Sequence, residues 1–203
     1  KVIEIDEDLS EGEQVYTLAH ELHSHLQVWH GFALRHTNWK FPDAVKFIEQ
    51  TESDADVVAT LKSAMLADPT ITENTYPDAL NALDDMSKYK KYAPGVAKIL
   101  GDHDLGPERS QVACRLSATW HETVSTVYYT HMVIIPTYQH ADKLDPDQRA
   151  RRVAMPEEAL SGLDSIHDDL AYFSVPESDC SVPLSPRQEA SQAWRGLMAS
   201  TPD

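Results

Sequence analysis

The chain has 203 residues, and its 33 Asp and Glu against 17 Lys and Arg give a formal net charge of −16 at pH 7. This charge argues against nucleic acids and anionic membrane surfaces as partners, because polyanions are bound by clustered Lys and Arg. The length predicts one domain, spanning residues 1–203, with a full hydrophobic core. The chain contains no run of about 18 apolar residues, so we expect no transmembrane helix. Residues 1–9 lack the apolar centre of a signal peptide, and the sequence does not decide between a cytoplasmic and an exported protein.

The first elements predicted along the chain are a short strand and a long helix. Residues 1–5 alternate β-branched and polar side chains, which is typical of an edge strand. Ser10 and Glu13 have the spacing of a capping box, and they predict a helix that ends near Gly31. Apolar residues recur along this helix at steps of three and four, and they predict its core-facing side: Val15, Leu18, Ala19, Leu22, Leu26 and Trp29.

The rest of the chain is predicted to be helical. A second long helix begins at Pro42 and ends before Pro69. Short helices broken by Pro and Gly follow to residue 107, and Tyr89 and Tyr92 with their neighbouring lysines predict a solvated helix face there. A third long helix is expected over residues 110–132, ended by Pro136. Helices over 149–152, 156–172 and 188–198 and a loop over 174–186 complete a mainly α fold of about five to seven helices and one strand.

The most informative segment is residues 18–27, Leu-Ala-His-Glu-Leu-His-Ser-His-Leu-Gln. A zinc-binding helix normally carries two histidines four residues apart, with a glutamate directly after the first. Four residues turn the helix by about 400°, so both imidazoles lie about 40° apart on one face. His20 and Glu21 fit this pattern, but the position four residues after His20 is Ser24.

Three interpretations of Ser24 remain open. His25 is the second ligand if a π-bulge absorbs the extra residue, because five regular α-helical residues would leave the two imidazoles about 140° apart. His23 is the ligand if the site uses the i, i+3 spacing of carboxylate–histidine metal sites. In the third interpretation Ser24 marks a scaffold that has lost its metal.

The second long helix supplies a carboxylate. Glu52 falls on the apolar stripe of that helix, where an unpaired carboxylate is costly and a metal ion is one of the few partners that offsets the cost. Asp56, one turn later, is placed to accept the outer N–H of a ligating histidine. We therefore expect Zn²⁺ as the cofactor, with His20, His25 and Glu52 as its ligands.

These motifs resemble a known family. Ala19-His20-Glu21-Leu22 with Gln27, followed by Glu52-Ser53-Asp54-Ala55, is similar to the zinc helix and following Glu-x-Asp-Ala helix of a group of bacterial zincin-type metallopeptidases. The resemblance covers about the first 70 residues, a zinc-helix core of gluzincin type, and leaves residues 71–203 as a helical remainder. The five-residue spacing of His20 and His25 resembles that of the dipeptidyl peptidase III family, which binds zinc through His-Glu-Leu-Leu-Gly-His.

The resemblance implies a minimal zincin-like fold and a zinc-dependent peptidase acting on a peptide or protein substrate. Glu21 would be the general base that takes a proton from the attacking water. His121 and Tyr128, seven residues apart on one face of the third long helix, are candidates for stabilising the oxyanion. The alternative is a catalytically degenerate peptidase-like scaffold that acts through protein–protein contacts.

Overall fold

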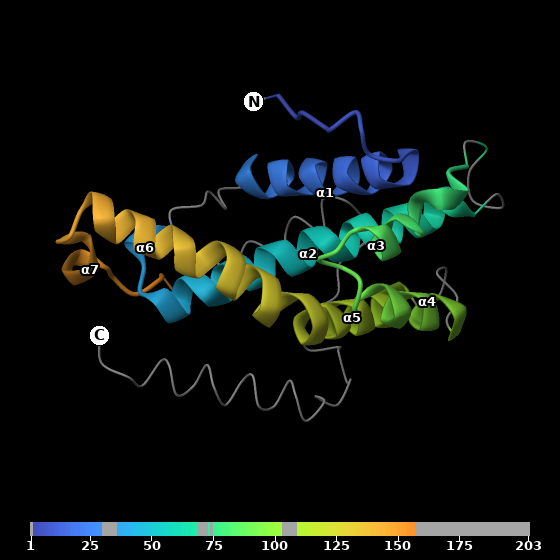
Figure 1. Cartoon of the computed structure of the whole chain (residues 1–203). Helices are drawn as coiled ribbons and strands as arrows, with labels where there is room; N and C mark the ends of the chain where they lie inside the picture. The colour runs from blue at the N-terminus through green and yellow to red at the C-terminus, as the bar shows by residue number, and fades with distance from the viewer. Residues whose placement is uncertain (1, 30–35, 69–72, 74, 103–108, 157–203) are drawn as a thin grey trace.

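The fold is mainly α-helical, as predicted, in the computed structural model, which describes residues 2–29, 36–68, 73, 75–102 and 109–156 (Figure 1). Three predicted elements lie outside the described residues, apart from residue 156: the helices over 156–172 and 188–198 and the loop over 174–186. The described α-helices are α1 (Glu11–Trp29), α2 (Phe41–Ala67), α3 (Ala82–Asp85), α4 (Ala93–Asp102), α5 (Arg109–Trp120), α6 (Ile135–Leu144) and α7 (Gln148–Arg151). The 3-10 turns η1 (His36–Asn38) and η2 (Pro77–Ala79) and the π-helix η3 (His121–Ile134) complete them.

Helix α2 is the central element of the structure. In Figure 1 α1 lies along one side of α2, and the continuous rod of α5, η3 and α6 crosses α2; α2 contacts α1, α5 and η3. The main hydrophobic cluster joins side chains of α1, α2, α4, α5 and η3, among them Tyr16, Phe47, Leu61, Leu116 and Trp120. Although α2 has 27 residues, neither it nor any other described helix is long and apolar enough to cross a membrane.

The predicted N-terminal strand is not formed: residues 2–5 belong to no strand. In the described residues the only β-pairing is an isolated parallel bridge between Trp39 and Val153. An edge strand exists only where a neighbouring segment pairs with its backbone groups. The alternating pattern of residues 2–5 was therefore insufficient to form a strand, because none of the described residues pairs with this segment.

The start of α1 is as the capping box predicts. The backbone N–H of Ser10 donates to Glu13 Oε2 at 2.9 Å, and the backbone N–H of Glu13 donates to Ser10 Oγ at 3.3 Å. Two N–H groups at the helix start, which have no partner within the helix, are thereby satisfied.

The side of α1 that faces the core was predicted wrongly. Its buried residues are Gly12, Tyr16, His20, His23 and Gln27. Four of the six predicted stripe residues point to solvent instead: Leu18, Leu22, Leu26 and Trp29 are exposed by 41%, 50%, 36% and 87%. Val15 is half-buried, and Ala19 packs against the core. The reason is chemical, because α2 offers buried carboxylates that the polar side of α1 can satisfy and that leucines would leave unpaired.

The third long helix does not end at Pro136. It passes through the π-helix η3, where the N–H of Ile135 donates to the carbonyl of Thr130, five residues back, and continues as α6 with Pro136 in its first turn. Proline in an α-helix clashes with the carbonyl four residues back and lacks an N–H donor. The wider π register and the first-turn position together allow the rod to continue past Pro136.

The exposed stripe gives a direct test of the orientation of α1. We expect Leu22→Gln to change the free energy of unfolding by less than about 0.5 kcal/mol, because the side chain is half exposed. Leu61→Ala in α2, where the side chain is 1% exposed, should cost about 2–5 kcal/mol. Urea denaturation followed by circular dichroism measures both values, and a large loss in Leu22→Gln would show that the apolar stripe is packed.

Candidate functional site

The centre of the candidate site is Asp56, a carboxylate on α2 with 0% of its surface exposed. The hydroxyl of Tyr89 donates to its Oδ1 at 2.5 Å, and the indole N–H of Trp120 donates to its Oδ2 at 2.5 Å. The hydroxyl of Tyr16 lies 3.3 Å from Oδ1. Burial alone would raise the pKa of Asp56, but His20, the charge of Lys88 and the Tyr89 hydroxyl together outweigh burial and hold the pKa below its usual value.

His20 projects from α1 towards the same carboxylate. Its Nδ1 lies 2.8 Å from Asp56 Oδ1, so Nδ1–H donates and the ring is fixed in orientation. Its Nε2 lies 3.6 Å from Glu52 Oε2. Burial would lower the pKa of His20, but the negative charges of Asp56 and Glu52 outweigh burial and raise it.

Glu52 lies one turn before Asp56 on α2, with 24% of its side chain exposed. Burial raises the pKa of Glu52, and the nearby His20 opposes the shift. The neighbouring hydroxyl of Tyr129, in η3, also lowers the pKa of Glu52. Glu52 therefore faces His20 on one side and a buried tyrosine on the other.

The His20–Glu52 pair fits two corners of a zinc site. With Zn–N and Zn–O bonds of about 2.1 Å and a tetrahedral angle, two ligand atoms lie about 3.4 Å apart; the observed separation of His20 Nε2 and Glu52 Oε2 is 3.6 Å. A third corner is not formed, since no group of three or more His, Cys, Asp or Glu in the described residues could hold a metal ion. The structure thus assembles part of the predicted ligand set.

The structure does not add His25 to this pair. Helix α1 is regularly α-helical between His20 and His25, without the π-bulge that would bring the two imidazoles together. The Nδ1–H of His25 donates to the carbonyl of Glu21 at 3.1 Å, and His25 Nε2 is buried with no hydrogen-bond partner in the described part of the chain. Ser24, one turn after His20, is half-buried and occupies the place of the expected second histidine.

His23 contacts a different acid. Its Nε2 lies 2.5 Å from Asp54 Oδ2, and Gln27 Nε2 donates to the same oxygen and to the carbonyl of Thr51, both at 2.9 Å. These contacts fasten the C-terminal half of α1 to α2. His23 and Gln27 therefore have a structural role that fixes the position of the His20 helix.

The residues predicted to stabilise an oxyanion do not share a face. A π-helix has about 4.4 residues per turn, so seven residues place His121 and Tyr128 on nearly opposite sides. The ring of His121 packs edge-on against the Trp120 indole, with centroids 5.2 Å apart. Tyr128 packs against Tyr129, and it is Tyr129 that reaches Glu52.

The sequence analysis missed Tyr16, Tyr89, Trp120 and Tyr129. Tyr89 and Tyr92 were expected on a solvated face, yet they are 1% and 0% exposed. One signal was present: a buried carboxylate on an apolar helix requires donors, and tyrosine and tryptophan are residues that stay apolar while providing one. Which of them would converge was not encoded in local spacing.

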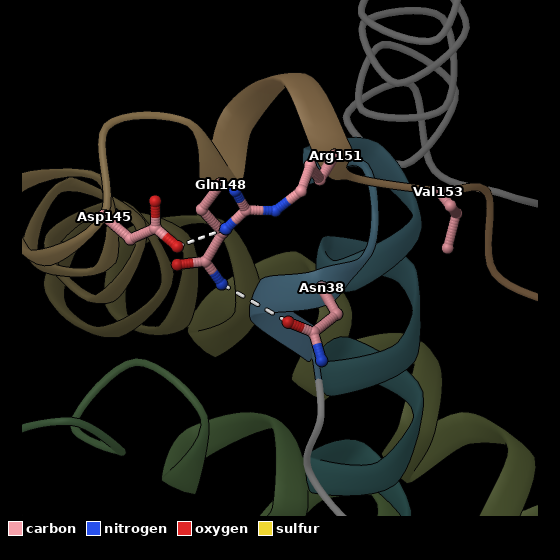
Figure 2. Close-up of a pocket in the computed structure, with 5 residues that line it drawn as sticks. All are labelled: Asn38, Asp145, Gln148, Arg151 and Val153. Carbon is pink, nitrogen blue, oxygen red and sulfur yellow. Dashed lines mark hydrogen bonds and ion pairs between the residues drawn. The ribbon is translucent and has the colours of Figure 1, made fainter.

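A separate surface pocket lies near the N-terminal end of α2, about four helical turns from Asp56. Figure 2 shows its lining residues: Asn38, Asp145, Gln148, Arg151 and Val153. Arg151 forms an ion pair with Asp145, and Gln148 Nε2 donates to Asn38 Oδ1 at 3.3 Å. These polar groups already pair with each other, so the pocket serves the contact between η1 and α7.

The pKa shifts predict how stability depends on pH in metal-free protein. Burial raises the pKa of Glu52 above 4.5, and that of His20 is raised above 6.5 because its carboxylate neighbours outweigh burial. Both groups therefore hold protons more tightly when folded, so the free energy of unfolding should fall as pH rises through each folded pKa. Asp56, whose pKa is lowered from 3.8, contributes a constant amount over this range.

Urea denaturation of EDTA-treated protein between about pH 5 and 8 checks this expectation. Glu52→Gln should remove the Glu52 part of the fall and keep the His20 part. Glu11→Gln, at an exposed position of α1, is the matched control. A stability that rises over this interval would contradict the assigned geometry.

Comparison with known proteins gives no match: no family model fits the chain, and no curated protein and no solved structure is significantly similar to it. The interpretation of the site therefore depends on the contacts between α1, α2 and η3.

Proposed function

We propose that this chain is a zinc-dependent peptidase in which His20 and Glu52 bind the metal. The observation that carries the proposal is the imidazole of His20, held at Nδ1 by the buried Asp56 and directed at Nε2 towards Glu52, 3.6 Å away. A histidine that binds zinc usually donates its other N–H to a carboxylate in this way. The zincin resemblance of the two helices supports the same assignment.

Bound zinc would supply Lewis-acid polarisation of the substrate carbonyl and a nucleophilic water near neutral pH. Asp56 keeps His20 in the tautomer whose Nε2 lone pair is free for a metal. Burial of Asp56 and the donors around it prevent the imidazole from rotating. The protein thus prepares the His20–Glu52 pair before any ligand arrives.

The remaining roles fall to Glu21 and Tyr129. Glu21 follows His20 on α1 and is partly exposed, so it can take a proton from the attacking water and pass it to the leaving amine. Tyr129, beside Glu52, is a hydroxyl donor whose pKa is raised by burial, and it therefore keeps its proton. In place of Tyr128 or His121, we assign Tyr129 to stabilise the developing oxyanion.

Metal analysis and peptide cleavage test these roles separately. We expect His20→Ala and Glu52→Gln to lose bound zinc and cleavage together, because each removes a ligand. Glu21→Gln should keep zinc and lose cleavage by about 10²–10⁴-fold. His140→Ala, at an exposed position of α6, is the control that should change neither; stoichiometric zinc in His20→Ala would overturn the ligand assignment.

The second candidate is a catalytically degenerate scaffold that acts through protein–protein contacts. Two observations favour it: Ser24 stands where a ligand is expected, and the described residues form no third metal ligand. The exposed leucines of α1 would then serve as a contact surface.

Ser24→His distinguishes the two candidates. A histidine four residues after His20 lies about 40° from it on α1 and would complete a three-ligand site. If wild-type protein has lost the metal, the variant should gain zinc binding, measured by competition with a chromophoric chelator. If His25 is a zinc ligand in wild-type protein, His25→Ala should weaken zinc binding. An unchanged zinc affinity would contradict the assignment of His25 as a ligand.

A further inference from the structure

Lys88 is a cation placed directly beside the candidate site. It lies in the segment between α3 and α4, and its Nζ is 3.5 Å from the hydroxyl of Tyr129, the tyrosine that neighbours Glu52. The ammonium also lies over the ring of Tyr89, 4.5 Å from the centroid. The rings of Tyr128 and Tyr129 are 5.7 and 5.8 Å away.

Among the described residues, Lys88 has no carboxylate in ion-pair contact. Within the part of the chain that the structure describes, no Asp or Glu oxygen lies within 4.0 Å of its Nζ. Its positive charge still acts on the site at longer range, since it lowers the pKa of both Glu52 and Asp56. A half-buried ammonium in a chain of net charge −16 would be expected to pair with one of the many acids.

Tyrosine rings surround the Lys88 ammonium in place of such a pair. Ring faces attract an ammonium within about 6 Å of the centroid, and the attraction offsets part of the cost of removing water. Rings do not neutralise charge, however, so the ammonium can still bind an anion. The three tyrosines therefore position the Lys88 ammonium at the edge of the His20–Glu52 pair.

We propose that Lys88 binds a carboxylate of the peptide substrate next to the bond that is hydrolysed. The proposal deepens the peptidase function and rests on it. The carboxylate is either the free C-terminus of the peptide or an acidic side chain. Since Tyr129 separates Lys88 from Glu52, the bound carboxylate lies near the reacting carbonyl, and the enzyme prefers anionic peptides despite its own negative charge.

The experiment measures binding and cleavage of matched peptides by the zinc-loaded 203-residue chain. One peptide has a free C-terminus, a second is its C-terminal amide, and a third is the amide with an internal Gln replaced by Glu. A charge-assisted contact predicts at least about tenfold tighter binding, by calorimetry, for the peptide whose carboxylate reaches Lys88. Comparing the peptide that has a free C-terminus with the peptide that contains Glu identifies which carboxylate binds to Lys88.

Lys88→Met should abolish this preference. We expect it to raise Kd and KM about tenfold for the peptide whose carboxylate binds Lys88, and to change them little for the neutral amide. Lys88→Arg should restore part of it. Lys90→Met, at an exposed neighbouring position, is the control. Zinc content and circular dichroism are measured for every variant, so a folding or metal defect is detected separately.

Two results would overturn the proposal. Equal binding of all three peptides by the wild-type protein would show that no carboxylate is recognised. Equal weakening of all three by Lys88→Met, with zinc retained, would show that Lys88 only balances the charge of Glu52 and Asp56. Carboxylate-selective binding that depends on Lys88 but occurs without hydrolysis would support this subsite and contradict the peptidase function.

Discussion

The buried carboxylate of Asp56 organises the structure. Since a charged oxygen removed from water must be surrounded by donors, the chain brings Tyr16 and His20 from α1, Tyr89 from the segment before α4, and Trp120 from α5 to one point. These elements are far apart in sequence. Their relative positions are therefore fixed as much by hydrogen bonds to one side chain as by apolar packing.

The orientation of α1 follows from this constraint. Two acids of α2, Asp54 and Asp56, each accept from a histidine of α1, so the polar side of α1 must face inwards. The leucines are left on the outside because a helix cannot bury both sides against one neighbour. An amphipathic helix packed in this way buries its polar side at the site and leaves an apolar surface exposed.

The same arrangement gathers polar side chains at one edge of Asp56. His20 is oriented by the fully buried carboxylate of Asp56, while Glu52 is partly exposed to solvent. A π-helix forms this wall of the site, and such widened turns concentrate at functional sites because they change which side chains face inwards. Tyr129 faces the site in place of Tyr128 for this reason.

The sequence by itself determined the helical class, the start of α1 and both ends of α2, and it singled out His20, Glu52 and Asp56 as candidates, because caps, prolines and charged residues within apolar stripes are local signals. It could not determine which side of α1 is buried, since the apolar stripe and the histidines both had helical spacing. It also missed the donors around Asp56 and the register of η3. Only the tertiary structure decided these, because they depend on which distant side chain satisfies a buried carboxylate.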